Sequence, residues 1–273
     1  MKKILLTWMC ISFIGLLSAQ DTISFKTYYE NGLAKFKKKD YSSAISDFTK
    51  AIEKKVDLAP AYFYRAASYK SVNKQNDALT DYNKAIELNQ TNKDFYFYRA
   101  LLRNDLKDTA GALTDLASAI NINATFDKAY FERAKIKFGS NDYKSAIEDF
   151  QLAIKNNETN HEAYNLMGKA KLYEKDTIGA IASYNKSIEL KPDFVLAYNN
   201  RAMVKYSQKD YESAKSDYTK VIELKPTDAQ AYFFRAIVEI ALKLKSDACV
   251  DFNKAKELGN TKAEEMITKY CKE

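Results

Sequence analysis

The segment APAYFYRAASYKSVNKQNDALTDYNKAIELNQTN, residues 59–92, returns six more times in this chain without a gap. The seven copies, each 34 residues long, cover 25–58, 59–92, 93–126, 127–160, 161–194, 195–228 and 229–262. Self-similarity at a fixed period of about 20–50 residues is typical of proteins that stack small structural units. The sequence therefore predicts a repeat protein in which residues 25–262 form one array.

Four positions are nearly constant from copy to copy. Numbered from the start of a copy, position 4 is always tyrosine, position 8 is glycine or alanine, position 20 is alanine and position 24 is large and apolar. In the second copy these residues are Tyr62, Ala66, Ala78 and Tyr82. A spacing of four residues returns to the same face of an α-helix, so each copy is predicted to form two helices.

The middle of each copy is predicted to be a turn. Aspartate stands there in five copies, as Asp40, Asp108, Asp142, Asp176 and Asp210. Aspartate at this place caps the free N–H groups of a following helix. One such helix pair cannot bury its apolar face alone, so neighbouring pairs must stack on one another.

This pattern resembles the tetratricopeptide repeat family over residues 25–262. The family signature is an aromatic residue, then Leu-Gly, then Tyr, then Ala, Phe and Ala, then Pro. In the fifth copy it appears as Tyr164, Gly168, Ala180, Tyr184 and Pro192. The resemblance implies an all-α fold, a right-handed α-solenoid of seven helix-turn-helix repeats. Two departures from the signature are an arginine in place of the leucine before the small residue, in five copies, and a mostly polar residue in place of the later tyrosine.

Residues 1–19 are predicted to be a signal peptide, followed by a short extension at 20–24. Lys2 and Lys3 precede an apolar run from Ile4 to Leu17, and small residues follow it. An uncleaved anchor ranks second because the run is shorter than the ~20 residues that a span needs. A lipid on Cys10 is disfavoured by the residues before it. We expect an exported protein of a bacterial envelope, periplasmic first, with secreted or outer-membrane-associated as alternatives, and no membrane span in the mature chain.

The C-terminal residues 263–273 are predicted to form a capping helix that covers the open end of the array. Cys249 and Cys271 are the two cysteines left after removal of the signal peptide. An even pair in an exported protein suggests a disulfide between this helix and the last repeat. The alternative is two buried thiols.

Arginine at position 7 recurs together with aspartate at position 23. The pairs are Arg65 and Asp81, Arg99 and Asp115, Arg133 and Asp149, Arg201 and Asp217, and Arg235 and Asp251. Both residues are missing from the fifth copy, which has Met167 and Ser183 instead, and this joint loss favours structural ion pairs within one copy. A row of arginines that binds an anionic ligand is the alternative.

A peptide-binding groove is implied by the family resemblance, lined by the residue that follows the constant tyrosine. These residues are Phe63, Phe97, Phe131, Asn165, Asn199 and Phe233. The alternative is that the phenylalanines only pack between adjacent helices.

No catalytic, metal-binding or cofactor-binding pattern is found in the sequence. His161 is the only histidine and is predicted to lie at an exposed junction between copies, and no cysteine cluster or glycine-rich phosphate loop is present. The formal charge is +7, and removal of the predicted signal peptide with Lys2 and Lys3 lowers it to +5 (41 basic against 36 acidic residues). This small excess is spread over mixed-charge copies, which argues against nucleic-acid binding. We expect a non-enzymatic scaffold for a protein or peptide partner. The alternative is a structural subunit of an envelope assembly that packs through its ends and convex face.

Overall fold

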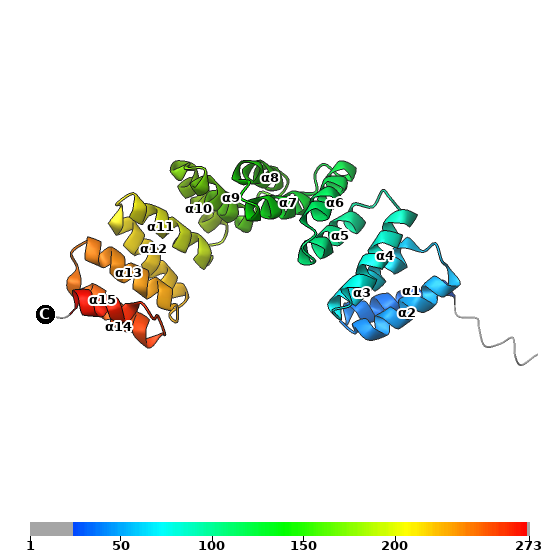
Figure 1. Cartoon of the computed structure of the whole chain (residues 1–273), viewed down its shortest axis with the longest axis horizontal. Coiled ribbons are helices and arrows are strands. Elements are labelled where there is room, and N and C mark those ends of the chain that lie inside the picture. The colour runs from blue at the N-terminus through cyan, green and yellow to red at the C-terminus, as the bar shows by residue number, and fades with distance from the viewer. Residues whose placement is uncertain (1–23, 272–273) are drawn as a thin grey trace, which may run out of the picture. The chain divides into compact units, whose positions relative to one another are not determined.

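The computed structural model describes residues 24–271, and all regular secondary structure in that range is helical (Figure 1). The helices are α1 (Phe25–Lys37), α2 (Tyr41–Lys54), α3 (Ala59–Ser71), α4 (Gln75–Leu88), α5 (Lys93–Asp105), α6 (Thr109–Ile122), α7 (Asp127–Gly139), α8 (Tyr143–Asn156), α9 (His161–Tyr173), α10 (Thr177–Leu190), α11 (Val195–Ser207), α12 (Tyr211–Leu224), α13 (Ala229–Ala241), α14 (Lys245–Glu257) and α15 (Ala263–Tyr270). The predicted signal peptide, the extension up to residue 23 and the last two residues lie outside the described range. Each copy forms one helix pair, so the predicted all-α repeat architecture is confirmed.

The second helix of a pair begins at a capping aspartate in five copies. Oδ1 of Asp40, for example, accepts the backbone N–H of Ser43 at 3.2 Å, and Asp176 accepts that of Gly179 at 2.8 Å. The same bond forms at Asp108, Asp142 and Asp210. These caps satisfy N–H groups that a helix start leaves without an intrahelical partner.

The turn between the two helices of each copy contains one residue with a positive φ angle, at position 15. These residues are Lys39, Asn73, Lys107, Asn141, Lys175, Lys209 and Lys243, with φ between 60° and 67°. Asparagine adopts this left-handed conformation more readily than lysine does. The five lysines therefore hold a conformation that costs them backbone energy.

The core of each pair consists of the constant positions. Alanine at position 20 is fully buried in every copy, and the large residue at position 24 is at most 2 % exposed. The position-24 residues are Phe48, Tyr82, Leu116, Phe150, Tyr184, Tyr218 and Phe252. The position-8 residue is small because the position-24 ring needs the space: a methyl group on Gly32 would lie 2.7 Å from Cε1 of Phe48.

The helices group into two compact units, one up to residue 123 and one from residue 124. The described part of the first contains α1–α6, and that of the second contains α7–α15. Within each unit, the second helix of one pair packs against the first helix of the next pair. The sequence copies continue in register across this division, so the repeat pattern does not reveal it.

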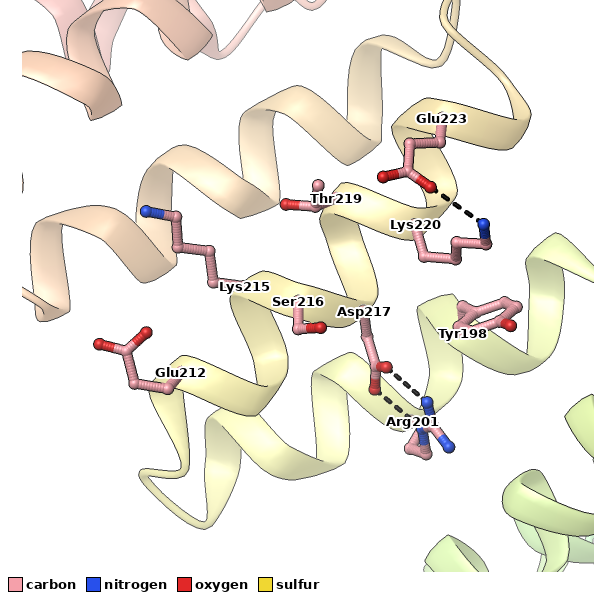
Figure 2. A pocket seen from close by; sticks show the side chains of 9 residues that line it. All are labelled: Tyr198, Arg201, Glu212, Lys215, Ser216, Asp217, Thr219, Lys220 and Glu223. Atoms are coloured by element: carbon pink, nitrogen blue, oxygen red, sulfur yellow. Dashed lines mark hydrogen bonds and ion pairs between the residues drawn. The ribbon is translucent and has the colours of Figure 1, made fainter.

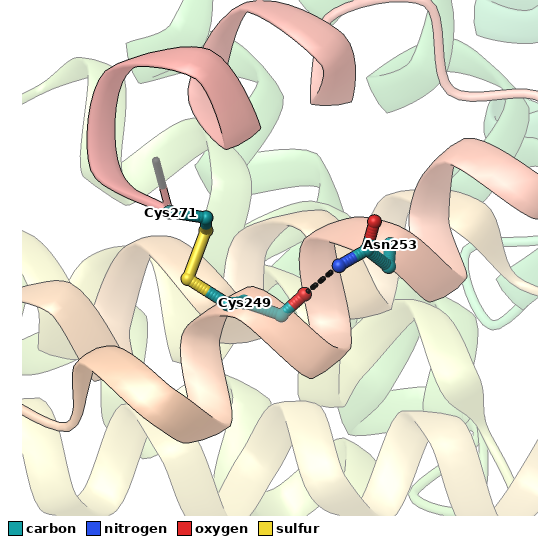
Figure 3. Close-up of a disulfide and its surroundings, with 3 residues drawn as sticks. All are labelled: Cys249, Asn253 and Cys271. Carbon is teal, nitrogen blue, oxygen red and sulfur yellow. Dashed lines mark hydrogen bonds between the residues drawn. A yellow bond between two sulfur atoms is a disulfide. The ribbon is translucent and has the colours of Figure 1, made fainter. Parts of the chain in front are cut away.

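The short helix α15 covers the end of the second unit. Its apolar residues Met266, Ile267 and Tyr270 pack against a core that includes Phe233 and Phe252. Cys249 on α14 and Cys271 directly after α15 are joined by a disulfide in the structure, with Cα atoms 5.7 Å apart (Figure 3). Among the described residues, no helix is long and apolar enough to span a bilayer.

Candidate binding surface

Five arginine–aspartate pairs connect the first and second helices of their copies. Nε of Arg65 donates to Oδ2 of Asp81 over 2.7 Å, and Nη2 donates to Oδ1 over 2.9 Å. The same two-bond contact joins Arg99 to Asp115, Arg133 to Asp149, Arg201 to Asp217 and Arg235 to Asp251. All five aspartates are at most 5 % exposed. Such parallel bonds between a guanidinium and a carboxylate are strong and directional.

The constant tyrosine at position 4 lies over the arginine of its own copy. The guanidinium carbon of Arg133 is 5.5 Å from the ring centroid of Tyr130. The other four pairs have the same arrangement at 5.4–5.8 Å. The hydrogen bond to Asp149 raises the pKa of Arg133 above its ordinary value. With its face covered and its Nε and Nη2 donors occupied, each arginine offers little to an anionic ligand.

Four of these arginines also reach the preceding copy. Their third nitrogen, Nη1, donates to a side chain at position 25 of that copy. The bonds run from Arg65 to Thr49, Arg99 to Asn83, Arg201 to Asn185 and Arg235 to Thr219, over 2.6–3.2 Å. The arginine thus binds one helix pair together and also connects it to its neighbour.

A second cation at position 11 contacts the same buried aspartate in several copies, and the sequence interpretation did not include it. Lys137 lies 2.8 Å from Asp149, and Lys205 lies 2.9 Å from Asp217. Lys35 with Asp47 and Arg103 with Asp115 form the equivalent contacts at 2.7 and 2.9 Å. The signal was present as a lysine or arginine twelve residues before the aspartate.

The fifth copy fills the same space without charges. Met167 is 7 % exposed and packs with Phe150 and neighbouring alanines. Ser183 donates its hydroxyl to the carbonyl of Gly179 over 2.7 Å. An apolar side chain, and a hydroxyl that is hydrogen-bonded within its own helix, therefore replace the ion pair.

The seventh copy has an acid, Glu239, where others have the second cation. Glu239 is 3 % exposed, and its Oε1 lies 3.4 Å from Nζ of Lys215. Its Oε2 has no hydrogen-bond partner among the described residues. Burial, and then the nearby charge of Asp251, raise the pKa of the Glu239 carboxyl above its ordinary value.

The six residues predicted to line a groove lie mostly between helices. Phe97 and Phe233 are 6 % exposed and Asn165 is 5 % exposed, so these three offer almost no surface to a peptide. Phe63, Phe131 and Asn199 are half-buried. Phe63 packs on Phe95 with ring centroids 5.0 Å apart, Phe131 packs on Phe150 at 6.0 Å, and Phe233 packs on Phe252 at 5.7 Å. For the buried residues the structure favours packing between adjacent helices, the alternative interpretation.

The exposed apolar side chains of the first helices lie at other positions. In the second unit α9 exposes Leu172 and Tyr173, and a larger group lies on α11 and α13. We call the set formed by Leu196, Asn199, Met203, Tyr206, Phe234 and Ile237 the α11–α13 surface. Leu196 is 57 % exposed, Met203 54 %, and Tyr206 and Phe234 each 37 %. The four α11 residues follow one another at intervals of three or four, which places them on one helix face.

A small apolar pocket opens on the α11–α13 surface. It has a volume of about 160 Å³ and is lined by Met203, Tyr206, Tyr218, Phe234, Ile237 and Val238. Clusters of exposed apolar side chains of this kind mark sites where proteins bind other molecules. Met203 and Tyr206 were not among the residues predicted from the sequence. Their signal was a pair of apolar residues on a helix face that does not contribute to the repeat core.

A larger polar hollow of about 520 Å³ lies along α12 (Figure 2). Its cationic side chains are already paired: Arg201 with Asp217, Lys220 with Glu223, and Lys215 with Glu239, which the figure does not draw. Figure 2 shows the first two of these contacts as dashed lines. Each cation that lines the hollow therefore already has an anionic partner, and the hollow is poorly suited to an anionic ligand.

No group of side chains in residues 24–271 has the composition of a metal site. His161 packs edge-on against Phe194 with centroids 4.8 Å apart, and its buried Nε2 has no hydrogen-bond partner in the described chain. The expectation that this histidine is exposed was wrong, because the residue is half-buried and its Nε2 is covered at the junction between copies.

Comparison with known proteins supports the family resemblance. Family models described as tetratricopeptide repeat match residues 127–160, 161–194 and 195–228, three of the seven copies. No curated protein matches the chain.

Several solved structures share the fold. The C-terminal part of a TPR repeat-containing protein from Cytophaga hutchinsonii is 23% identical, with a TM-score of 0.76, over 87% of this chain and 98% of that chain. A tetratricopeptide repeat protein from Parabacteroides merdae is 21% identical, with a TM-score of 0.64, over 91% of this chain and 99% of that chain. YrrB, described as a TPR protein with an unusual peptide-binding site, is 19% identical, with a TM-score of 0.60, over 69% of this chain and 97% of that chain.

Proposed function

This chain is a tetratricopeptide repeat protein, and from that premise we propose that it is a non-enzymatic scaffold that binds a protein or peptide partner on the exposed faces of its first helices. The observation that carries the proposal is the α11–α13 surface. There, Leu196 and Met203 expose more than half of their side chains beside an apolar pocket. A folded chain gains stability by covering such side chains, so a surface that keeps them exposed suits a partner.

The peptide-binding site described for YrrB, a TPR protein of similar fold, supports binding of a peptide or partner helix. The residues that carry binding in this chain differ from those first expected. We assign it to side chains at positions 2, 6, 9 and 12 of the first helices, because those at position 5 are largely buried between helices.

We further propose that the protein is exported and acts in a bacterial envelope, most simply in the periplasm. The signal-peptide pattern of residues 1–19 and the Cys249–Cys271 pair both support this location, because disulfides persist in oxidising compartments.

Affinity capture tests the scaffold. The mature chain is immobilised and exposed to a detergent-solubilised envelope extract, beside a variant with Leu196→Glu and Met203→Glu. Both positions are exposed, so the variant should fold, which circular dichroism checks. Ile178→Glu is the matched control, because Ile178 is an apolar residue that is 82 % exposed on a second helix.

A partner that is retained by the wild type and the control but lost on the α11 variant supports binding at this surface. A partner lost on the Ile178 variant alone would favour the other candidate function, a structural subunit that packs through its second helices. The exposed Ile178 and Val250 on α10 and α14 are the observation in favour of that candidate.

A further inference from the structure

The apolar pocket on the α11–α13 surface has the size and lining of a site for a single side chain. This inference rests on the proposed scaffold function and names the chemistry of the segment that is bound. We propose that the pocket takes one phenylalanine ring from an extended, uncharged segment of a partner protein. Its volume of about 160 Å³ is close to that of an apolar cavity, about 150 Å³, that binds benzene.

The walls of the pocket favour an aromatic ring over an aliphatic side chain. Three of the six lining residues are aromatic, and Phe234 stacks on Tyr218 with centroids 5.9 Å apart. Aromatic pairs contribute beyond the area they bury. The thioether of Met203, which also lines the pocket, makes favourable contacts with ring edges.

The surroundings of the pocket indicate that the bound segment is uncharged. The cations of α11, Arg201 and Lys205, are both bonded to Asp217, and Arg235 of α13 is bonded to Asp251. One helical turn from Met203 and Phe234, the surface residues are Asn199, Asn200 and Gln230. A charged side chain placed here would lose water without gaining an opposite charge.

Two asparagines beside the pocket have amide groups left to hold a peptide backbone. Nδ2 of Asn200 donates to Oδ1 of Asn165 over 2.9 Å, which leaves its own oxygen as an acceptor. Asn199 is half-buried, and its side chain makes no hydrogen bond with another described residue. An amide offers both a donor and an acceptor, which matches the alternating groups of an extended backbone.

Methionine methyl NMR tests the proposal on the full chain. The sequence has five methionines, and of those in the described range only Met203 borders the pocket, whereas Met167 and Met266 lie elsewhere in the same unit and serve as internal controls. The probe is the uncharged peptide GSTFTSG with blocked ends, compared with GSTATSG. The Met203 resonance is assigned from the variant Met203→Leu.

We expect the phenylalanine peptide to shift the Met203 signal in a saturable way and to leave those of Met167 and Met266 in place. The affinity of the alanine peptide should be lower by a factor of about ten or more, because this peptide lacks the ring that the pocket buries. Affinity should be the same at low and high salt, since no ion pair contributes. Filling the pocket with Ile237→Trp should abolish the shift, read at Met203, while the matched control Ile178→Trp should not.

Three results would overturn the inference: no saturable change at Met203, an equal response to the alanine peptide, or binding that needs charged residues beside the phenylalanine and weakens with salt. The scaffold proposal fails separately. Suppose that binding of a captured partner depends on Leu196 but is unchanged in the Ile237→Trp variant. This result would support the scaffold proposal and refute the proposal of a phenylalanine site.

Discussion

The ion pair of the fourth copy gives the sharpest stability prediction, because the fifth copy contains a natural replacement for it. Asp149 is 2 % exposed and accepts two bonds from Arg133, and Lys137 lies 2.8 Å away. Removing one partner of a buried pair costs about 3–5 kcal/mol. Because Lys137 remains, we expect Arg133→Met to lower the free energy of unfolding by about 3 kcal/mol, the low end of that range.

Replacing the other partner of the pair, Asp149, should cost less stability. Asp149→Ser leaves two cations whose side chains are 21 % and 23 % exposed and can turn toward water, so about 1–2 kcal/mol is expected. The double variant reproduces the Met167 and Ser183 combination. We expect the stability lost in the double variant to be about 2 kcal/mol smaller than the sum of the losses in the two single variants, which is within the range found for residues in contact.

The assay is urea unfolding followed by circular dichroism for the wild type, both single variants and the double variant. The control is the opposite exchange, Met167→Arg with Ser183→Asp, which should likewise be milder than Met167→Arg alone. Single costs that add to the double cost within about 0.5 kcal/mol would refute the reasoning, because independent sites behave in that way.

The disulfide, the buried acid and the left-handed turn residue each give a further prediction. Replacing Cys249 and Cys271 by serine should loosen α15 and remove about 3 kcal/mol, as expected for a closed loop with a sequence separation of 22, and two reactive thiols in unfolded, unreduced protein would contradict the disulfide. Glu239→Gln should stabilise the protein at neutral pH. The pKa of Glu239 is raised in the folded protein, so the neutral carboxyl is the form that the fold accommodates. The stability that this group contributes is fully present below its unfolded pKa and is lost as the pH rises through its folded pKa. Melting curves should therefore show that the advantage of the variant disappears in acid. Lys175→Gly should raise the melting temperature through a gain of about 1 kcal/mol, since glycine adopts the φ of 64° without steric cost, whereas the same change at Lys191, with φ −141°, should not.

The repeat pattern was sufficient to predict the helices and their internal contacts. Tyr62, Ala66, Ala78 and Tyr82 stand at positions that keep the same character in every copy, and a contact made within one copy keeps a fixed sequence separation. The arginine–aspartate separation of 16 residues belongs to this class. Such contacts depend only on how one helix pair folds.

Contacts whose geometry depends on neighbouring pairs were harder to predict. Phe97 was expected on an open face, yet it is 6 % exposed, so neighbouring groups cover it. Met203 was overlooked for the converse reason, since a single exposed methionine resembles a gap-filling core residue in a sequence. Whether neighbouring groups cover a side chain decides both cases, and the residue type alone does not encode it.

The bond from four of the arginines to position 25 of the preceding copy has a consequence for how the length of such a chain can change. The acceptor belongs to one copy and the donor to the next, always in the same register. Loss of residues 195–228 would bring Asn185 into the place now held by Thr219, and Asn185 already accepts from an arginine in that register. The new junction would be rebuilt with native chemistry. A deletion whose length is not a multiple of 34 residues would put the wrong helix face at the junction. We therefore expect this chain to tolerate growth or shortening only in whole steps of 34 residues.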